Sequence, residues 1–194
     1  MEWAIRRSHS DHGAAAVIFT ETSMPGAWLV EPEPLRDERG WFARTFDAAE
    51  FRARGLDDRV VQESVSYNAR AGTLRGLHYQ ASPHEEAKLV RCSRGAIFDV
   101  IVDLRRGSPT HRRWFSVELD ARTGRMLYVP EGLAHGFQTL MDDTEVHYRM
   151  NRGYAPEHAR GLRWDDPVLG VEWPDAERII SARDASFPDI DPSV

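Results

Sequence analysis

Cysteine is nearly absent from the sequence, and so are long apolar runs. Cys92 is the only cysteine among 194 residues, which excludes an intrachain disulfide and is usual for proteins of a reducing compartment. The apolar stretch near the N-terminus, residues 14–19, is too short for the core of a secretory signal or for a membrane span. We therefore expect a cytoplasmic protein that is held together by packing and has no membrane partner.

Nucleotide-binding motifs and strong charge are also missing. The sequence contains no glycine-rich phosphate loop, nucleophile elbow or dinucleotide fingerprint. The net charge of -6 is modest and spread along the chain, so no basic surface for nucleic acid is indicated. With 41% hydrophobic residues, the chain suits one domain with one core. We expect its partner to be a small molecule.

Lysine is also scarce. Lys88 is the only lysine among 25 lysine and arginine residues. All the other cationic side chains are arginine, so arginine suffices wherever any cation will do. The one lysine therefore indicates a site that needs a compact ammonium group able to lose its proton, because a guanidinium group stays charged. The alternative explanation is that this one lysine has been retained by chance and has no special role.

The pattern of apolar residues predicts a mainly β protein. Residues 1–22 are expected to form a polar N-terminal extension and residues 23–194 a single domain. Asp47 and Glu50 have capping-box spacing, which with Gly55 predicts a short helix over residues 48–54. Strands are predicted at residues 74–80, 88–93, 96–104, 113–119, 125–129, 136–140 and 145–150. Turn sequences separate them, as in a β-sandwich or barrel, and the proline- and tryptophan-rich region after residue 150 predicts a segment that wraps over it.

Alternation along two of these strands places titratable side chains inside. Tyr148 is in phase with Val146 and Met150, and Lys88 is in phase with Val90. A buried ammonium group is costly unless it is paired or lines a wet cavity. The two positions together indicate a barrel with a polar pocket.

A histidine on the strand at 74–80 is the next candidate. His78 is in phase with Gly76, and on periodicity alone a hydrogen-bonded core histidine is favoured. Strict alternation sends Arg75 to the opposite face, unless a bulge at Gly76 turns both side chains inward. A metal site built on a His-x-His pair is incomplete, because position 80 is Gln and His135 stands alone. We expect no metal, although a metalloenzyme stays open.

A histidine, a tyrosine and a lysine form a set with one plausible chemistry. Histidine can take a proton from a carbon beside a carbonyl, lysine can stabilise the enolate oxygen, and tyrosine can return a proton on the opposite face. From these residue types alone the hypothesis is suggestive.

Several ordered runs resemble one family, the dTDP-4-dehydrorhamnose 3,5-epimerases. The most distinctive is Leu-Arg-Gly-Leu-His-Tyr-Gln at residues 74–80. The others lie at residues 39–42, 88–91, 98–105, 107–110, 130–137 and 181–184. Their order and spacing match the family from about residue 28 to 188. The resemblance implies a cupin jelly-roll barrel that forms a homodimer and needs neither metal nor cofactor.

The resemblance also implies roles for individual residues. His78 corresponds to the general base, Asp184 to the carboxylate that orients it, Tyr148 to the acid, and Lys88 to the residue that holds the 4-keto oxygen. The substrate-binding positions that the resemblance implies, from the diphosphate to the nucleobase, are Arg39, Phe42, Gln62, Arg75, His135, Tyr154 and Arg183. Among these, Arg39 and Arg75 correspond to residues that grip the diphosphate, which suits a fork of donors, and Tyr154 to one that stacks on the base.

Four positions depart from the family pattern. Arg44 stands where Glu is usual, Ser64 where Asn is common, Ala159 where Glu is common and Arg183 where Lys is common. These departures lie at the nucleotide end, so the base or sugar could differ from the family standard.

The resemblance implies an isomerase that converts dTDP-4-dehydro-6-deoxy-D-glucose to the L-manno form by inverting C3 and C5, in the dTDP-L-rhamnose pathway. Three alternatives stay open. One is a mono-epimerase that inverts C3 or C5 only, one is a non-catalytic sugar-nucleotide-binding cupin, and one is a metal-dependent cupin oxygenase, which Gln80 disfavours.

Overall fold

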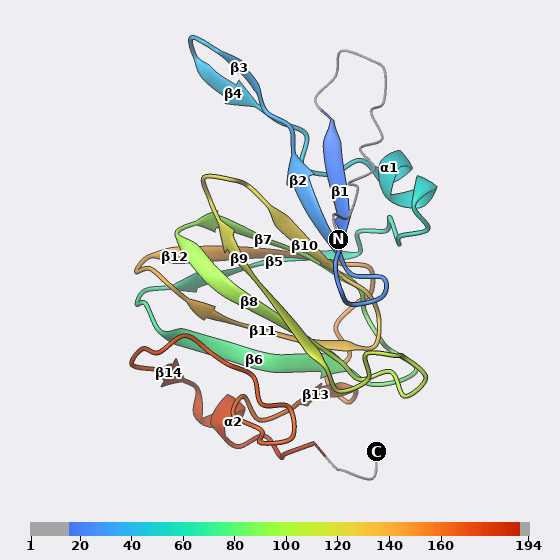
Figure 1. Ribbon diagram of the computed structural model, residues 1–194, viewed down its shortest axis with the longest axis vertical. Helices are drawn as coiled ribbons and strands as arrows, with labels where there is room; N and C mark the ends of the chain where they lie inside the picture. The colour runs from blue at the N-terminus through green and yellow to red at the C-terminus, as the bar shows by residue number, and fades with distance from the viewer. Residues whose placement is uncertain (1–15, 191–194) are drawn as a thin grey trace, which may run out of the picture.

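Two antiparallel sheets facing each other form the body of the protein (Figure 1). The structure is a computed structural model that describes residues 16–190. In the first sheet the order is β1 (Val17–Glu21), β2 (Trp28–Pro32), β10 (Met126–Val129), β7 (Lys88–Arg94), β12 (Thr144–Met150) and β5 (Gln62–Asn68). In the second the order is β13 (Ala159–Gly161), β6 (Thr73–Gln80), β11 (Leu133–Thr139), β8 (Ala96–Asp103) and β9 (Trp114–Asp120), and β14 (Ile179–Ile180) pairs in parallel with β6.

The seven predicted strands are confirmed as β6 to β12, within a few residues at each end. Their inward-facing apolar side chains meet between the sheets, with Val90 and Val146 from the first sheet packed against Ile101 and Phe137 from the second. Burial of the inward-facing side chains of both sheets against each other holds the two sheets face to face. The predicted mainly β jelly roll is therefore confirmed.

The expected polar extension over residues 1–22 is wrong in its last part. Val17–Glu21 form β1, which pairs with β2 along its whole length, and the Val17 side chain is buried. Three consecutive residues with high strand propensity, Val17, Ile18 and Phe19, explain the difference. Residues 1–15 of the expected extension lie outside the described residues.

The predicted helix is present as α1 (Ala48–Ala53). The Asp47 side chain accepts hydrogen bonds from the backbone N–H groups of Ala49 and Glu50, as an N-cap residue does. Phe51 is the buried residue of the helix, and it packs with Tyr128 on the outer face of the first sheet.

The C-terminal segment, residues 151–190, covers the outer face of the second sheet (Figure 1). Leu162, Leu169, Trp173 and Ile190 bury their side chains against that sheet. Asp166 fixes the end of the segment, because its carboxylate accepts hydrogen bonds from the backbone N–H groups of Val168, Leu169 and Ile190. The segment carries α2 (Ala182–Ala185), which lies beside β6.

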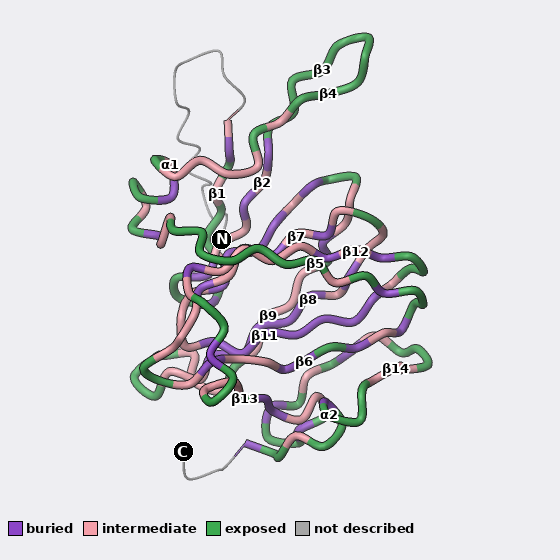
Figure 2. The backbone as a smooth tube through the Cα atoms, turned by 180° about the vertical axis from the view of Figure 1, so that it is seen from behind, coloured by how far each residue is buried: buried purple, intermediate pink, exposed green. Residues whose placement is uncertain are grey.

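A hairpin of β3 (Leu35–Asp37) and β4 (Gly40–Phe42) projects away from both sheets (Figure 1). All six strand residues are exposed, as the green loop at the top of Figure 2 shows. Trp41 and Phe42 are 50% and 66% exposed. Two large apolar side chains on a projecting hairpin are expected where another surface covers them.

Asp103, at the end of β8, is the buried charge on which the adjoining loop depends. Its carboxylate accepts hydrogen bonds from the Arg105 guanidinium at 2.8 and 2.9 Å, from Ser108 Oγ and from Thr110 Oγ1. Burial alone would raise the pKa of Asp103, but these hydrogen bonds outweigh it and hold the pKa below its usual range. The carboxylate therefore stabilises the fold in its charged form.

We expect Asp103→Asn to lower the free energy of unfolding by about 3 kcal/mol, because it leaves Arg105 without its buried partner. Since the folded pKa is depressed, the contribution of Asp103 is fully present above about pH 4 and is lost as the pH falls through the folded pKa. Urea unfolding at pH 7 and pH 3 measures both effects. Asp165→Asn, in the exposed pair with Arg163, is the control and should cost less than about 1 kcal/mol. Equal losses in the two variants would contradict the assignment.

Candidate active site

A cavity of about 460 Å³ opens between the two sheets. Both sheets and the C-terminal segment contribute to its wall. The residues that line it are Gln62, Ser64, Arg75, His78, Tyr79, Gln80, Glu86, Lys88, His135, Phe137, Tyr148, Met150, Tyr154, Ala159, Arg160 and Arg183. A concave site with polar groups converging on an apolar floor is the form that small-molecule sites take. Eight of the site residues expected from the sequence are in this lining.

A bulge in β6 turns both Arg75 and His78 into the cavity. Against β11, His78 pairs with His135 whereas Arg75 pairs with Phe137, so β6 holds one extra residue between the two pairs. Gly76 lies at this point with a φ of 134°, and a Cβ there would come 2.5 Å from the Cα of Gly136. The bulge that the sequence allowed is present, and glycine is required because no side chain fits between the strands.

His78 is held by a carboxylate from the far end of the chain. Its Nε2 lies 3.0 Å from Oδ1 of Asp184, whose Oδ2 accepts a hydrogen bond from the Gly76 backbone N–H at 3.2 Å. The His78 side chain is 42% exposed and that of Asp184 only 8%. Burial raises the pKa of Asp184, but the hydrogen bonds from His78 and Gly76 outweigh it and lower the pKa. The carboxylate therefore stays charged and orients an imidazole that opens to the cavity.

Lys88 points inward, as the sequence predicts. Its Nζ lies 3.2 Å from Oε1 of Glu86, and the two side chains are 11% and 12% exposed. The ammonium group is thus paired with a carboxylate at the wall of a cavity, and pairing is what makes a buried lysine tolerable. Glu86 was not expected from the sequence, because it lies in a loop, where neither the helical nor the strand periodicity of apolar residues applies.

Tyr148 is close to Lys88 on the same inner face. In the ladder between β12 and β7, Tyr148 pairs with Val90 and Met150 pairs with Lys88, so Tyr148 and Lys88 are diagonal neighbours. Burial, together with the charge of Asp99, raises the pKa of Tyr148. The phenol consequently holds its proton at neutral pH and can act as an acid.

His135 has its own buried carboxylate. Its Nε2 lies 2.7 Å from Oδ1 of Asp99, and the two side chains are 5% and 0% exposed. The other Asp99 oxygen has no hydrogen-bond partner among the described residues. Asp99 was missed as a site residue, although a charged residue in phase with Ile97 and Ile101 of an otherwise apolar strand is itself a signal.

Three arginine side chains line the cavity, and all three are exposed. Arg75 is fixed by a 2.8 Å hydrogen bond from its Nε to Oδ1 of Asn68. Arg183 lies over the ring of Phe187, with its Cζ 5.8 Å from the ring centre. Arg160 lines the same cavity. Three guanidinium groups in one cavity favour an anionic ligand such as a diphosphate.

Gln62 and Tyr154 form one unit at the edge of the cavity. The Gln62 side chain accepts a 2.6 Å hydrogen bond from the Tyr154 backbone N–H, and the Tyr154 ring is 57% exposed. An exposed ring on a fixed backbone is suited to stacking on a planar ligand group. Ser64 and Ala159, two of the positions that depart from the family pattern, line the same cavity.

Arg39 and Phe42 are the expected site residues that the structure does not bring to the cavity. Both lie on the projecting hairpin, and Arg39 is paired with Asp37. Arg44 is also outside the lining, with its Nη1 3.2 Å from the Asp47 carboxylate. Within one chain, the cavity is therefore formed without them.

The fold and sequence match known proteins over nearly the whole chain. Residues 21–191 match the family model described as dTDP-4-dehydrorhamnose 3,5-epimerase. A relative of that name from Sinorhizobium fredii is 44% identical over 175 residues, which is 90% of each chain. A solved 3,5-epimerase from Bacillus anthracis, with TDP and PPi bound, is 40% identical with a TM-score of 0.87, covering 90% of this chain and 100% of the other.

A second solved structure adds a bound sugar nucleotide. The 3,5-epimerase from Legionella pneumophila, in complex with dTDP-4-keto-L-rhamnose, is 36% identical with a TM-score of 0.84, covering 90% of this chain and 93% of the other. Identity at this level over this share of both chains shows membership of one family and not only a shared fold. The protein is therefore a member of the dTDP-4-dehydrorhamnose 3,5-epimerase family.

Proposed function

We propose that the protein inverts C3 and C5 of dTDP-4-dehydro-6-deoxy-D-glucose, which gives the L-manno isomer used in the dTDP-L-rhamnose pathway. One observation carries the proposal. His78 on β6 and Tyr148 on β12 come from opposite sheets and line one cavity, with Lys88 next to Tyr148. A base and an acid on opposite walls are what inversion at a carbon requires.

The chemistry follows from the position of the ketone. C3 and C5 both flank the C4 carbonyl, so removing a proton from either gives an enolate. His78, oriented by Asp184, takes the proton, and the Lys88 ammonium stabilises the negative oxygen. Tyr148 then delivers a proton to the opposite face, and the configuration is inverted. Exchange with solvent removes the proton from His78 and returns one to Tyr148 before the second carbon reacts.

The nucleotide end of the substrate extends to the opening of the cavity in this proposal. Arg75 and Arg183 bind the diphosphate, His135 binds the sugar, and Tyr154, held by Gln62, stacks on the base. Arg39 and Phe42 complete the site from a second copy of the chain, so the active form is a homodimer. The exposed Phe42 on the projecting hairpin supports this arrangement.

A cytoplasmic location is part of the same proposal, and the solitary cysteine supports it. No helix within residues 16–190 has the length and apolar character needed to cross a bilayer.

Isotope exchange tests the proposed reaction. The purified protein is incubated with the 4-keto sugar nucleotide in deuterated water, and label at C3 and C5 is followed by NMR. Label at both carbons with inversion supports the proposal, whereas label at one carbon would identify a mono-epimerase. Binding without label would leave a sugar-nucleotide-binding cupin, and activity that a chelator abolishes would contradict the scheme.

Lys88→Arg tests the argument from the solitary lysine. We expect kcat to fall by roughly 10- to 100-fold, because arginine keeps the charge but is too large and planar to place one donor on the enolate oxygen. Steady-state kinetics measures the loss. Arg125→Lys, at the partly exposed pair with Glu31, is the matched control and should leave kcat unchanged. An unchanged rate in Lys88→Arg would show that any cation suffices at this position.

A further inference from the structure

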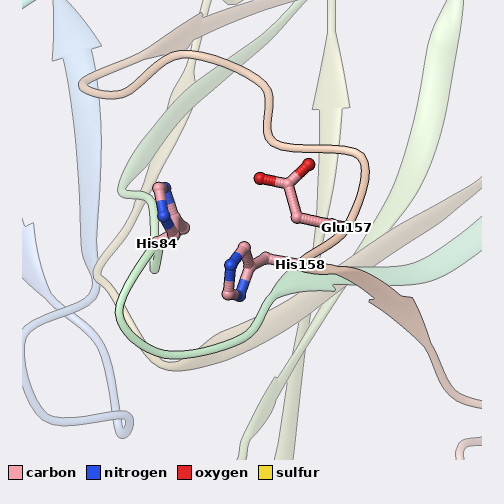
Figure 3. Close-up of side chains that lie close together, drawn as sticks. All are labelled: His84, Glu157 and His158. Atoms are coloured by element: carbon pink, nitrogen blue, oxygen red, sulfur yellow. The ribbon is translucent and has the colours of Figure 1, made fainter.

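Three side chains with metal-binding atoms meet beside the cavity, outside the proposed catalytic residues. His84 lies in the loop between β6 and β7, and Glu157 and His158 lie just before β13 (Figure 3). One ligand atom from each residue lies within 4.8 Å of the other two. In Figure 3 the Glu157 carboxylate lies on the same side of the loop as the two rings.

These side chains have no other polar partner within residues 16–190. The two imidazole rings stack on each other, with centroids 4.3 Å apart and planes at 30°. Arg160 donates to the backbone carbonyl of Glu157 and not to its carboxylate. Two imidazoles and one carboxylate are therefore available as ligands, which is the donor set that transition-metal ions such as Zn²⁺ prefer.

The backbones that carry the ligands are already tied together. The Ala81 backbone N–H donates to the His158 carbonyl at 2.8 Å. The Gln80 side chain donates to the His84 carbonyl at 3.0 Å and accepts from the Ala155 N–H at 2.6 Å. Ligands on a tetrahedral Zn²⁺ stand roughly 3.4 Å apart, given bonds of about 2.1 Å. Rotation of the side chains, with Glu157 exposed at the surface, closes the remaining gap.

We propose that His84, Glu157 and His158 bind one divalent transition-metal ion, for which Zn²⁺ is the reference. The ion is held by two imidazole nitrogens and one carboxylate oxygen, and water completes its coordination. Binding turns at least one ring out of the stack, because the lone pair of an imidazole lies in the plane of its ring. The sequence did not indicate this site, since His84 and His158 are far apart along the chain.

The ion ties together two segments that form part of the cavity wall. The loop with His84 also carries Glu86, and the segment with His158 also carries Tyr154 and Ala159. We expect saturation with Zn²⁺ to change KM for the nucleotide substrate more than kcat, since the ion contacts none of the reacting groups. This consequence rests on the proposed function, whereas ion binding itself does not.

Binding is tested on the full chain, purified without an affinity tag and stripped with chelator. Calorimetric titration with Zn²⁺ should show one tight equivalent, and Co²⁺ should give the visible absorption of a site with nitrogen ligands. The double variant His84→Ala/His158→Ala should lose that equivalent, and Glu157→Gln should weaken it by about 10-fold or more. His9 and His12 are a second close pair in the sequence, so His9→Ala/His12→Ala is the matched control and should keep it.

Two results would overturn the proposal. One is a stripped wild-type protein that takes up no Zn²⁺, and the other is a His84→Ala/His158→Ala protein that binds Zn²⁺ as tightly as the wild type. Far-UV circular dichroism of each variant confirms that the sheets are intact. Epimerase activity is measured on the same samples. A protein that binds Zn²⁺ but does not convert the substrate would contradict the proposed function and leave the metal site supported.

Discussion

His78→Ala is expected to abolish deuterium incorporation at both C3 and C5, with kcat reduced by about 10³-fold. The reason is structural as well as chemical. The His78 imidazole lines the cavity, is 42% exposed and is paired with the charged carboxylate of Asp184. His135, the other histidine in the lining, is 5% exposed and its Nε2 is bound to Asp99. Within the described lining, no other exposed imidazole can therefore take over.

Two further variants separate the role of His78 from general damage. Asp184→Asn keeps the size of the partner but removes its charge, and we expect an intermediate loss of about 10²-fold in kcat with little change in KM. His147 is next to Tyr148 on β12 but lines a different pocket. The variant His147→Ala should therefore keep wild-type exchange. Exchange above one-tenth of the wild-type rate in His78→Ala would contradict the assignment of the base.

Tyr148→Phe is expected to separate exchange from inversion. The substitution removes only the hydroxyl group, so His78 can still take a proton and return one to the same face. Formation of the L-manno product should fall by about 10²- to 10³-fold, while deuterium still appears in the recovered substrate. Burial raises the pKa of Tyr148, so the phenol carries its proton when the substrate binds.

NMR of the recovered substrate and of the product measures both quantities in one reaction. Tyr67→Phe is the control, because Tyr67 is 52% exposed on the edge strand β5 and is bound to Asp143. It should leave both exchange and product formation unchanged. Product formation at the wild-type rate in Tyr148→Phe would mean that another group supplies the proton.

The seven longer strands with a buried face, β6 to β12, could be predicted from the sequence, whereas the short β1 and β2 and the exposed strands were missed. β12 alternates between apolar and polar residues, and β8 is a nearly continuous apolar run between turn sequences, so pattern and length identify these strands. β5, Gln62–Asn68, is an edge strand whose residues are mostly exposed, and its polar sequence carries no such period. β3 and β4 were missed for the same reason, because all their residues are exposed.

The site could be predicted in part for similar reasons. Alternation places Lys88 and Tyr148 inside, and both line the cavity. Asp184 could be paired with His78 only through the family resemblance, because 106 residues separate them and no local pattern joins residues so far apart. Arg75 faces the cavity only because of the bulge at Gly76. That bulge depends on how closely two backbones approach each other, which the periodicity of side chains does not reveal.

The wrapping segment has a consequence for the order in which the protein becomes active during synthesis. Every strand of the jelly roll from β1 to β12 leaves the ribosome before the segment that follows Met150. Asp184 comes near the end of that segment, which also buries Leu169 and Trp173 against the second sheet. A chain that stops between Met150 and Ser181 would hold Lys88, Tyr148 and His78 but would leave the imidazole without its orienting carboxylate. Translation thus delivers the strand residues of the cavity first, and the rest of its wall and the oriented base last.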